Sequence, residues 1–285
     1  MRFVTFRRGA ALPEPGVLKG TKVIGLKSLG FDTMIEVIEK WDDARPRIEG
    51  LLKNATADAF DDLSAVQLTA PILRPNKLLC VGLNYRDHAI ESGMEIPKVP
   101  TIFSKFASSI IGPGEKIVLP KKSEKPDYEA EFALVIGKGG RHIPEDKWKD
   151  HVFGYTILND VSARDYQLAT TQWLMGKTFD TFAPMGPAVV TADEISDPHN
   201  LDIKMTIGGE VLQNSNTKHL IFNIPTLIAY ISSVCTLEPG DIISTGTPAG
   251  VGLGHKPPRW LKPGDECVVS VQELGELRNP CVLED

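Results

Sequence analysis

The part of the chain after residue 77 is a succession of short extended segments, and this pattern restricts the fold more than any other feature. Runs rich in Val, Ile, Leu and Phe, such as "VFGYTILND" and "ECVVSVQELGEL", are separated by clusters of Pro and Gly. Helical patterns are few, and "NIPTLIAYISSVC" is one of them. Many strands with so few helices between them favour a β-rich α+β fold, a sandwich or roll, over a doubly wound parallel sheet.

The chain divides near residue 70. Before that point "MRFVTFRRG" and "KVIGL" are typical of strands, and "FDTMIEVIEKW" carries apolar residues at helical spacing. The segment "APILRPNK", with two prolines, has the composition of a linker. We therefore predict a small N-terminal α/β domain at residues 1–70 and a larger domain at residues 71–285.

Charge and hydropathy exclude several classes of partner. The formal net charge of −6 argues against nucleic acid or an anionic membrane as the main partner. We find no apolar run of about 18 residues and no hydrophobic signal segment, so no membrane association is expected. The four cysteines show no paired spacing, which favours free thiols in a reducing compartment over disulfides or zinc. We expect the cytoplasm, or alternatively the mitochondrial matrix if a transit peptide is already absent.

Two glutamates stand inside one of the extended segments, "DYEAEFALVIG" at residues 127–137. Because successive side chains of a strand point to opposite faces, Glu129 and Glu131 project on the same side, about 7 Å apart. The other face carries an apolar row that we expect to be buried: Tyr128, Ala130, Phe132, Leu134 and Ile136. Two neighbouring carboxylates repel each other and are costly to desolvate unless a cation or donor lies beside them. Taken alone, such a pair more often faces water.

A third carboxylate changes that interpretation. Asp160 ends the next apolar strand, and Ser162 with Asp165 fits a capping box that opens a helix. Three carboxylates without a nearby His or Cys form the donor set of a hard cation. We therefore predict that Glu129, Glu131 and Asp160 bind Mg²⁺, with Mn²⁺ or Ca²⁺ as alternatives.

The segment "NYRDHAIESG" (84–93) predicts a short helix with a catalytic pair. His88 and Glu91 are three residues apart, so they share a helix face. A carboxylate that orients an imidazole and raises its basicity makes a general base for water or for a carbon acid. The alternative is a surface His beside a surface Glu.

Three further polar side chains suit an anionic substrate. Arg164 and Gln167 share one face of the helix predicted after Ser162, and together they suit a carboxylate or oxo group. Lys177 stands between bulky apolar residues and could neutralise an enolate or carboxylate. The alternatives are an exposed helix surface for the first two, and a lysine that extends to solvent for the third.

The segment "EPGDIISTGTPAGVGLG" (238–254) predicts a short strand followed by a glycine-rich loop. Its "GVGLG" is not a dinucleotide fingerprint, because "HKPPRW" follows where a helix should begin. Such a loop can instead offer backbone N–H groups and the hydroxyl of Thr247 to an anion. A purely structural loop is the alternative.

Six segments, taken together and in order, resemble the fumarylacetoacetate hydrolase family. They are "CVGLNYRDH", "PTIFSKFASSIIGP", "DYEAEFALVIGK", "LNDVSARDYQ", "GKTFDTFAPMGP" and "GDIISTGTPAGVG". The resemblance covers about residues 70–285. It is closest to the domain-containing subgroup that is similar to acylpyruvases, oxaloacetate decarboxylases and oxaloacetate tautomerases. The segment "QWLMGKTFDTFAPMGP" is more similar to the mitochondrial tautomerase type than to the short decarboxylase type.

This resemblance implies a mixed β-sandwich roll that forms a homodimer. It places the divalent metal on Glu129, Glu131 and Asp160, and the catalytic base on a His–Glu pair of a lid, here His88 and Glu91. The substrate-contact positions of the family fall on four residues of suitable type: Arg164, Gln167, Lys177 and Thr247. Lys177 is also expected to take part in catalysis.

The implied enzyme acts on small α-keto or β-keto dicarboxylic acids through a metal-bound enolate. In this hypothesis the metal would bind the 1-carboxylate and 2-oxo oxygen, while Lys177, Arg164 and Gln167 would hold the carboxylate. His88, oriented by Glu91, would either move a proton at C3 or activate water for C–C hydrolysis. We expect oxaloacetate keto–enol tautomerisation; C–C bond hydrolysis of the acylpyruvase or fumarylpyruvate type, and oxaloacetate decarboxylation, are alternatives. An alternative of another class is a catalytically inactive metal-binding dimer.

Overall fold

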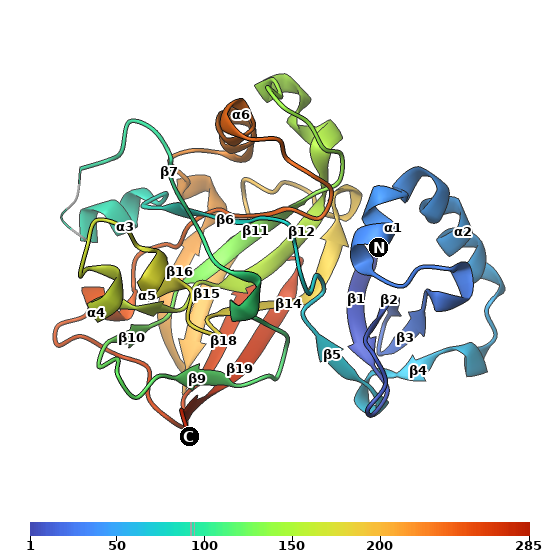
Figure 1. Ribbon diagram of the computed structural model, residues 1–285, viewed down its shortest axis with the longest axis horizontal. Helices are drawn as coiled ribbons and strands as arrows, with labels where there is room; N and C mark the ends of the chain where they lie inside the picture. The colour runs from blue at the N-terminus through green and yellow to red at the C-terminus, as the bar shows by residue number, and fades with distance from the viewer. Residues whose placement is uncertain (92, 94) are drawn as a thin grey trace.

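The computed structural model describes residues 1–91, 93 and 95–285, and in this part of the chain twelve strands form one large mixed sheet (Figure 1). Its order is β4-β3-β2-β1-β14-β12-β11-β17-β6-β7, with β5 paired to β1 and β8 to β14. The strands are β1 (Arg2–Arg7), β2 (Glu14–Lys19), β3 (Lys22–Gly25), β4 (Asp61–Asp62), β5 (Gln67–Thr69), β6 (Leu78–Gly82), β7 (Thr101–Ser104), β8 (Ile110–Ile111), β11 (Ala130–Ile136), β12 (Val152–Asn159), β14 (Ala183–Thr191) and β17 (Ile242–Ser244). Neighbours are antiparallel except β17–β6 and β14–β8, so the sheet is mixed.

A five-stranded sheet, of order β16-β15-β18-β19-β9, packs on one face of the large sheet (Figure 1). Its strands are β9 (Ile117–Leu119), β15 (Asp202–Ile207), β16 (Glu210–Asn216), β18 (Glu266–Val271) and β19 (Gly275–Leu283). One core cluster joins Phe132 and Leu134 of β11 to Ile203 of β15 and Val269 of β18. A short pair, β10 (Pro126–Asp127) and β13 (Ser162–Ala163), lies beside these sheets. The β-rich α+β class, and the sandwich of two packed sheets, are confirmed.

Helices lie around the edges and outer faces of the sheets (Figure 1). They are α1 (Met34–Glu39), α2 (Trp41–Asn54), α3 (Arg86–Glu91), α4 (Arg164–Gln167), α5 (Leu174–Lys177) and α6 (Ile224–Val234). Short 3-10 turns are η1 (Lys27–Leu29), η2 (Ala57–Ala59), η3 (Leu63–Ala65), η4 (Ala107–Ser109), η5 (Glu145–His151), η6 (Ala192–Glu194), η7 (Thr217–His219) and η8 (Gly252–Gly254). None of the described helices is long and apolar enough to cross a membrane. Three short α-helices, α3 to α5, gather at the end of the molecule away from the N-terminal helices.

Strand β11 is buried on both faces, whereas the sequence pattern predicts burial only of the face that carries the apolar row. The expected apolar row from Tyr128 to Ile136 lies in the core between the two sheets. The opposite face, on which Glu129 and Glu131 project, continues inward as Ala133 and Val135 and packs in a second core cluster. The glutamates therefore lie at the beginning of an interior face and do not face bulk water.

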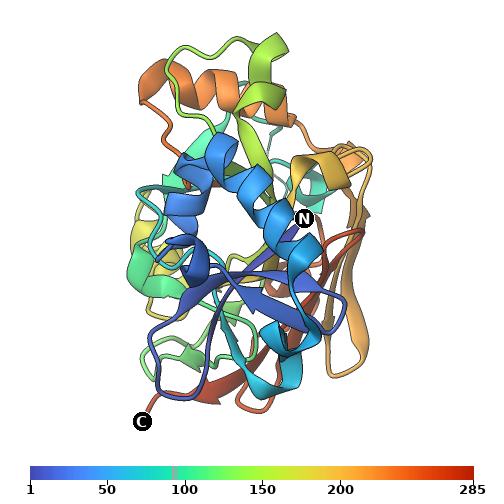
Figure 2. The same cartoon turned by 90° about the vertical axis from the view of Figure 1, so that its right-hand side faces the viewer.

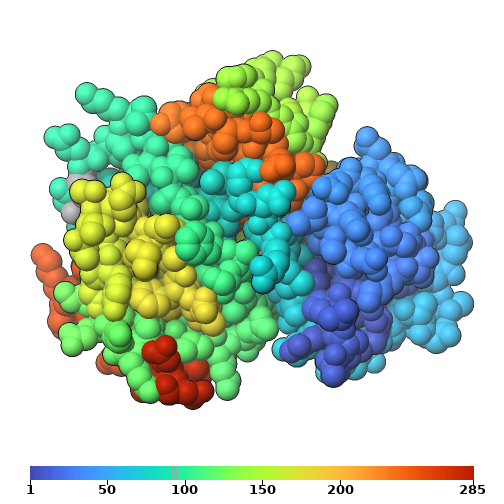
Figure 3. Space-filling model, in the orientation of Figure 1, coloured from blue at the N-terminus to red at the C-terminus, as the bar shows by residue number. Residues whose placement is uncertain are grey.

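The N-terminal strands continue the large sheet. Strand β1 pairs with β14 antiparallel, in register Arg2 with Val190 and Phe3 with Val189. The ring of Phe3 also packs against Trp41 and Phe153, with centroids 5.6 Å away in both cases. Residues 1–70 form a lobe on the right-hand side of the molecule in Figure 3, and Figure 2 views the molecule from that side. We propose that this lobe is a domain whose core is completed by residues 71–285.

A substitution on β11 tests the role of this strand in stability. Phe132 is fully buried and stacks on Tyr155, with centroids 5.1 Å apart and an interplanar angle of 26°. Phe132→Ala is expected to lower the free energy of unfolding by about 3–5 kcal/mol, because it removes apolar contacts and leaves a cavity. Urea denaturation measures the difference. The exposed Phe106 offers a control, and Phe106→Ala should change the same quantity by at most about 0.5 kcal/mol.

Candidate active site

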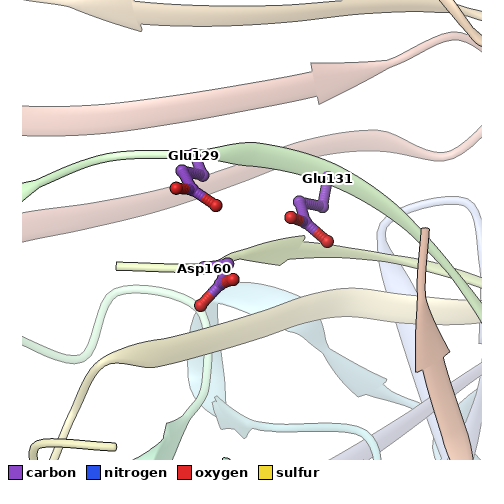
Figure 4. A group of neighbouring side chains, drawn as sticks. All are labelled: Glu129, Glu131 and Asp160. Atoms are coloured by element: carbon purple, nitrogen blue, oxygen red, sulfur yellow. The ribbon is translucent and has the colours of Figure 1, made fainter. Parts of the chain in front are cut away.

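Three buried carboxylates converge where β11 begins and β12 ends (Figure 4). Strands β11 and β12 pair with Ala130 opposite Asn159, and the N–H of Asp160 donates to the carbonyl of Glu129 at 2.9 Å. This register brings together Glu129, Glu131 and Asp160, which are 5, 1 and 0 % exposed. One carboxylate oxygen from each lies within 4.8 Å of the others. The predicted triad is thus assembled by the pairing of two adjacent strands.

The charges around the triad leave one carboxylate without a cation. Lys177 Nζ lies 2.8 Å from Glu129 Oε2 and 2.7 Å from Asp160 Oδ2, and Lys105 Nζ lies 2.5 Å from Asp160 Oδ1. Although burial opposes ionisation, Lys177 and Arg164 lower the pKa of Glu129 to about 2. Glu131 has no cationic side chain within 4.0 Å in the described part of the chain.

The surroundings of Glu131 fit a divalent cation. Its Oε2 accepts a hydrogen bond from Ser244 Oγ at 2.5 Å and from the N–H of Gly246 at 3.0 Å. Burial, with the nearby carboxylates of Asp160 and Glu129, raises the pKa of Glu131 well above its usual range. A buried carboxylate of this kind is costly unless positive charge offsets it. Three carboxylate oxygens with no nitrogen or sulfur donor suit a hard cation, so the triad fits a divalent metal of that class.

Arg164 is held rigidly and keeps one donor free. Its Nε donates to Asp127 Oδ2 at 2.8 Å, and its Nη1 lies 2.7 Å from Glu129 Oε1 and 2.9 Å from Gln167 Oε1. Its buried Nη2 has no hydrogen-bond partner among the described residues. An unpaired buried guanidinium nitrogen is rare, because it forfeits the hydrogen bonds it makes in water. Nη2 is therefore available to an incoming acceptor.

His88 and Glu91 form the predicted pair on α3. His88 Nδ1 lies 3.3 Å from Glu91 Oε2, and the N–H of Gly250 donates to Glu91 Oε1 at 2.9 Å. Although partial burial opposes it, these two contacts lower the pKa of Glu91. Asp87 lies inside the helix, which begins at Arg86, and its carboxylate accepts from the N–H of His88 at 2.8 Å. The imidazole thus has a fixed carboxylate partner on one ring nitrogen.

A cavity of about 400 Å³ joins the pair to the triad. The predicted residues that line it are His88, Glu91, Glu129, Glu131, Arg164, Gln167, Lys177 and Thr247. Asp160 does not line the cavity but touches Lys177, which does. The rest of the wall is largely apolar and includes Val81, Phe103 and Trp173. Gly82 leaves room for Trp173, because a Cβ there would lie 2.3 Å from its ring.

The capping box predicted for Ser162 and Asp165 is wrong. Helix α4 begins at Arg164 with Ala163 as N-cap and no capping side chain. The backbone of Ser162 is instead paired with Asp127 in the β10–β13 ladder, and its hydroxyl donates to the carbonyl of Asp160 at 3.0 Å. Asp165 accepts from Ser123 Oγ at 2.8 Å. Ser162 therefore supports the turn after Asp160 and does not cap the helix.

The glycine-rich loop turns its donors toward carboxylates of the protein. The N–H groups of Gly246, Gly250 and Gly252 donate to Glu131, Glu91 and Asp127 respectively. Thr247 Oγ1 donates to the carbonyl of Ala130 at 2.9 Å and accepts from Gln213 Nε2 at 2.8 Å. The predicted supply of backbone donors exists, but these N–H groups hold site residues in place.

Two buried charged residues of the site escape the sequence reasoning. Asp127 is fully buried against Arg164, and Lys105 is 3 % exposed against Asp160. A signal for Asp127 was present, because Asp127, Glu129 and Glu131 stand at alternate positions of one extended segment. Lys105 has no such signal, since its partner lies 55 residues further along the chain.

Comparison with known proteins agrees with this geometry. The family model described as fumarylacetoacetate (FAA) hydrolase C-terminal matches residues 77–282. The chain belongs to the fumarylacetoacetate hydrolase family. The family and the enzyme class predicted from the sequence are therefore confirmed.

Relatives within the fumarylacetoacetate hydrolase family are similar over most of the chain. "Oxaloacetate tautomerase fahd2, mitochondrial" of Xenopus laevis is 52% identical over 221 residues, which is 77% of this chain and 69% of the relative. "Oxaloacetate tautomerase Fahd2a, mitochondrial" of Rattus norvegicus is 48% identical over 253 residues, 88% of this chain and 80% of the relative. A solved structure, maleylpyruvate hydrolase from Sphingobium sp. SYK-6 in complex with manganese (II) ion and pyruvate, is 32% identical, with a TM-score of 0.84 and full coverage of both chains.

Proposed function

We propose that this chain is a divalent-metal-dependent oxaloacetate keto–enol tautomerase. The observation that carries the proposal is that the His88–Glu91 pair lines the same cavity as Glu129 and Glu131 of the carboxylate triad. Relatives that are 48–52% identical are named oxaloacetate tautomerase, which favours this reaction over the others open to such a site.

We propose Glu129, Glu131 and Asp160 as the metal ligands and Mg²⁺ as the metal. Carboxylate ligands together with small anionic substrates are typical of Mg²⁺ sites. The complex of the similar maleylpyruvate hydrolase with a manganese (II) ion supports a divalent ion as the cofactor. When bound, such an ion polarises a substrate oxygen and offsets negative charge that develops on it.

The chain supplies the groups that bind and orient a keto dicarboxylate. Arg164 offers its free Nη2, fixed in direction by the bonds on Nε and Nη1. The Lys177 ammonium, 1 % exposed, adds positive charge beside the cavity. Gln167 is a further proposed contact on the cavity wall, and Thr247, whose hydroxyl proton is donated to Ala130, can only accept a hydrogen bond from the substrate. Preorganised donors of this kind stabilise charge better than mobile ones, because they need no reorganisation during the reaction.

His88 is the proposed base that moves a proton at C3 of the substrate. Glu91 holds Nδ1, which leaves Nε2 as the nitrogen that can accept and return the proton. Lys177 is expected to take part in catalysis by stabilising the enolate that this transfer produces. Burial opposes the charge of the Lys177 ammonium, whereas the neighbouring Asp160 and Glu129 raise its pKa.

An assay on three substrates tests the proposal. With Mg²⁺ or Mn²⁺ present, enol-oxaloacetate should lose its absorbance faster with the enzyme than without it, and no more pyruvate should form than in the enzyme-free control. Cleavage of acylpyruvates would instead support C–C hydrolysis, a reaction that the similarity to a maleylpyruvate hydrolase favours as the second candidate. Pyruvate formed from oxaloacetate faster than in the enzyme-free control would indicate enzymatic decarboxylation. Metal uptake without turnover of any substrate would identify an inactive metal-binding protein.

Arg164→Lys is expected to raise the KM for oxaloacetate about 10- to 100-fold with a smaller change in kcat. The lysine ammonium keeps the positive charge but has neither the planar guanidinium nor the free Nη2 of arginine. The lost hydrogen bond from Nη2 to a charged substrate group is worth about 1.5–3 kcal/mol. Steady-state kinetics measures both constants. The exposed Arg141 is the matched control, and Arg141→Lys should leave KM unchanged. An unchanged KM in Arg164→Lys would exclude this side chain as the substrate anchor.

Oligomeric state and location are further parts of the proposal. We propose a homodimer, as the family resemblance implies, and light scattering of the purified protein tests it. Both oxaloacetate tautomerases described above are named as mitochondrial, which supports the mitochondrial matrix over the cytoplasm for this chain.

A further inference from the structure

Asp127 lies at the point where three parts of the active site meet. Its carboxylate is fully buried and accepts four hydrogen bonds, which come from different segments of the chain. Oδ1 accepts from the N–H of Tyr128 at 2.8 Å and from the N–H of Gly252 at 2.6 Å. Oδ2 accepts from Arg164 Nε at 2.8 Å and from the N–H of Leu253 at 3.0 Å. One side chain therefore connects the proposed substrate anchor to the glycine-rich loop.

The loop, in turn, holds the carboxylate of the catalytic pair. Gly250 donates its N–H to Glu91 Oε1 at 2.9 Å, while Glu91 Oε2 faces His88 Nδ1 at 3.3 Å. At Gly254 an added Cβ would lie 2.4 Å from the Glu91 carboxyl group, so the loop backbone is in close contact with that side chain. The orientation of the His88 imidazole thus depends on where this loop lies.

The fit between Asp127 and the loop leaves no space for a side chain. A Cβ added at Gly252 would lie 2.5 Å from Asp127 Oδ1 and 2.2 Å from the carbonyl oxygen of Arg259. Real Cβ atoms do not approach this closely, so the contact requires glycine. Helix α3 has a second attachment that does not involve the loop, the hydrogen bond from Ser215 Oγ to Asp87 Oδ2 at 3.1 Å.

We propose that Asp127 is a positioning residue that couples the substrate anchor Arg164 to the orientation of the His88–Glu91 pair through the loop at residues 250–254. Asp127 does not touch the substrate. One of its carboxylate oxygens fixes the direction of the Arg164 guanidinium, and both oxygens fix the position of the loop. Substrate binding and the orientation of the base therefore depend on the same side chain. The kinetic part of this inference rests on the proposed function, whereas the structural coupling does not.

Amide hydrogen exchange tests the coupling without reference to any activity. In Asp127→Asn one carboxylate oxygen becomes an NH₂ group, which is itself a donor and cannot accept hydrogen bonds from the N–H groups that face it. The loop and α3 therefore lose hydrogen bonds that hold them in place. We expect the amides of α3 and of residues 250–254 to exchange at least about tenfold faster, with the amides of β11 unchanged. Gly252→Ala breaks the same contact from the loop side and should give the same local pattern, which keeps the test available if Asp127→Asn fails to fold.

The control is a buried aspartate elsewhere. Asp241 is also fully buried and accepts from the N–H groups of Lys77 and Glu238, outside the site. Asp241→Asn should leave α3 exchange as in the wild type. Wild-type exchange of α3 in both Asp127→Asn and Gly252→Ala would overturn the proposal, as would faster exchange that includes β11, because that would indicate only a general loss of stability.

Kinetics supplies the second readout. Asp127→Asn is expected to raise KM and lower kcat together, each at least about tenfold, because both the anchor and the base are affected. A change in only one constant would overturn the coupling. If the wild type itself shows no turnover of oxaloacetate, the proposed function fails, but the exchange comparison still decides the role of Asp127.

Discussion

Replacing Glu131 with Gln is expected to abolish metal binding and to reduce turnover at least about a thousandfold. Lost Lewis-acid stabilisation of about 4 kcal/mol corresponds to that factor, and a neutral amide is a poor ligand for a hard cation. When no metal is present, the Glu131→Gln protein should be at least as stable as the wild type. The physical reason is that Glu131 is the triad member without a cationic partner in the described structure, so Gln removes a desolvation cost.

Two measurements separate these effects. Isothermal titration with Mg²⁺ and Mn²⁺ gives metal affinity, and urea unfolding with and without metal gives stability. Glu14 is the matched control, because it is a buried glutamate that pairs with Arg8, far from the triad in the N-terminal lobe. Glu14→Gln should lower the free energy of unfolding and leave metal binding intact. Stoichiometric metal binding by Glu131→Gln would show that this carboxylate is not a ligand.

Most of the candidate active site could be predicted, because the spacing of its residues within single strands and helices brings them together. The alternation of a strand puts Glu129 and Glu131 on one side, and the three-residue spacing of a helix puts His88 beside Glu91. Both relations hold in the structure. Lys177 was recognised as a cation, but its bridging position between Glu129 and Asp160 depends on how α5 packs, which no local pattern describes.

What could not be predicted depends on contacts between distant segments. Strand β2 was not predicted, because Pro15 and Gly16 are typical of turns. In the structure Gly16 is required there, since a Cβ would lie 2.6 Å from the ring of Phe6 on the paired strand β1. The pairing of β1 with β14 brings together residues that are distant in the sequence, such as Arg2 and Val190. An apolar strand has no sequence feature that selects one distant partner over another.

His88→Ala is expected to lower kcat about 10²- to 10⁴-fold, the usual contribution of a positioned general base, while metal affinity stays as in the wild type. The imidazole lines the cavity but is not among the three proposed metal ligands, so its removal leaves the carboxylate triad and the neighbouring lysines in place. Glu91→Gln should have a smaller effect, because the imidazole remains but loses the carboxylate that orients it.

The assay follows the enol absorbance of oxaloacetate at saturating Mg²⁺, with metal affinity measured separately by titration. His219 is exposed, and His219→Ala is the matched control that should retain wild-type kcat. Turnover by His88→Ala equal to that of His219→Ala would remove His88 from the mechanism. In that event the Glu91 carboxylate, which also lines the cavity, would be the next candidate for the base. A loss of activity in Glu91→Gln larger than that in His88→Ala would then identify it.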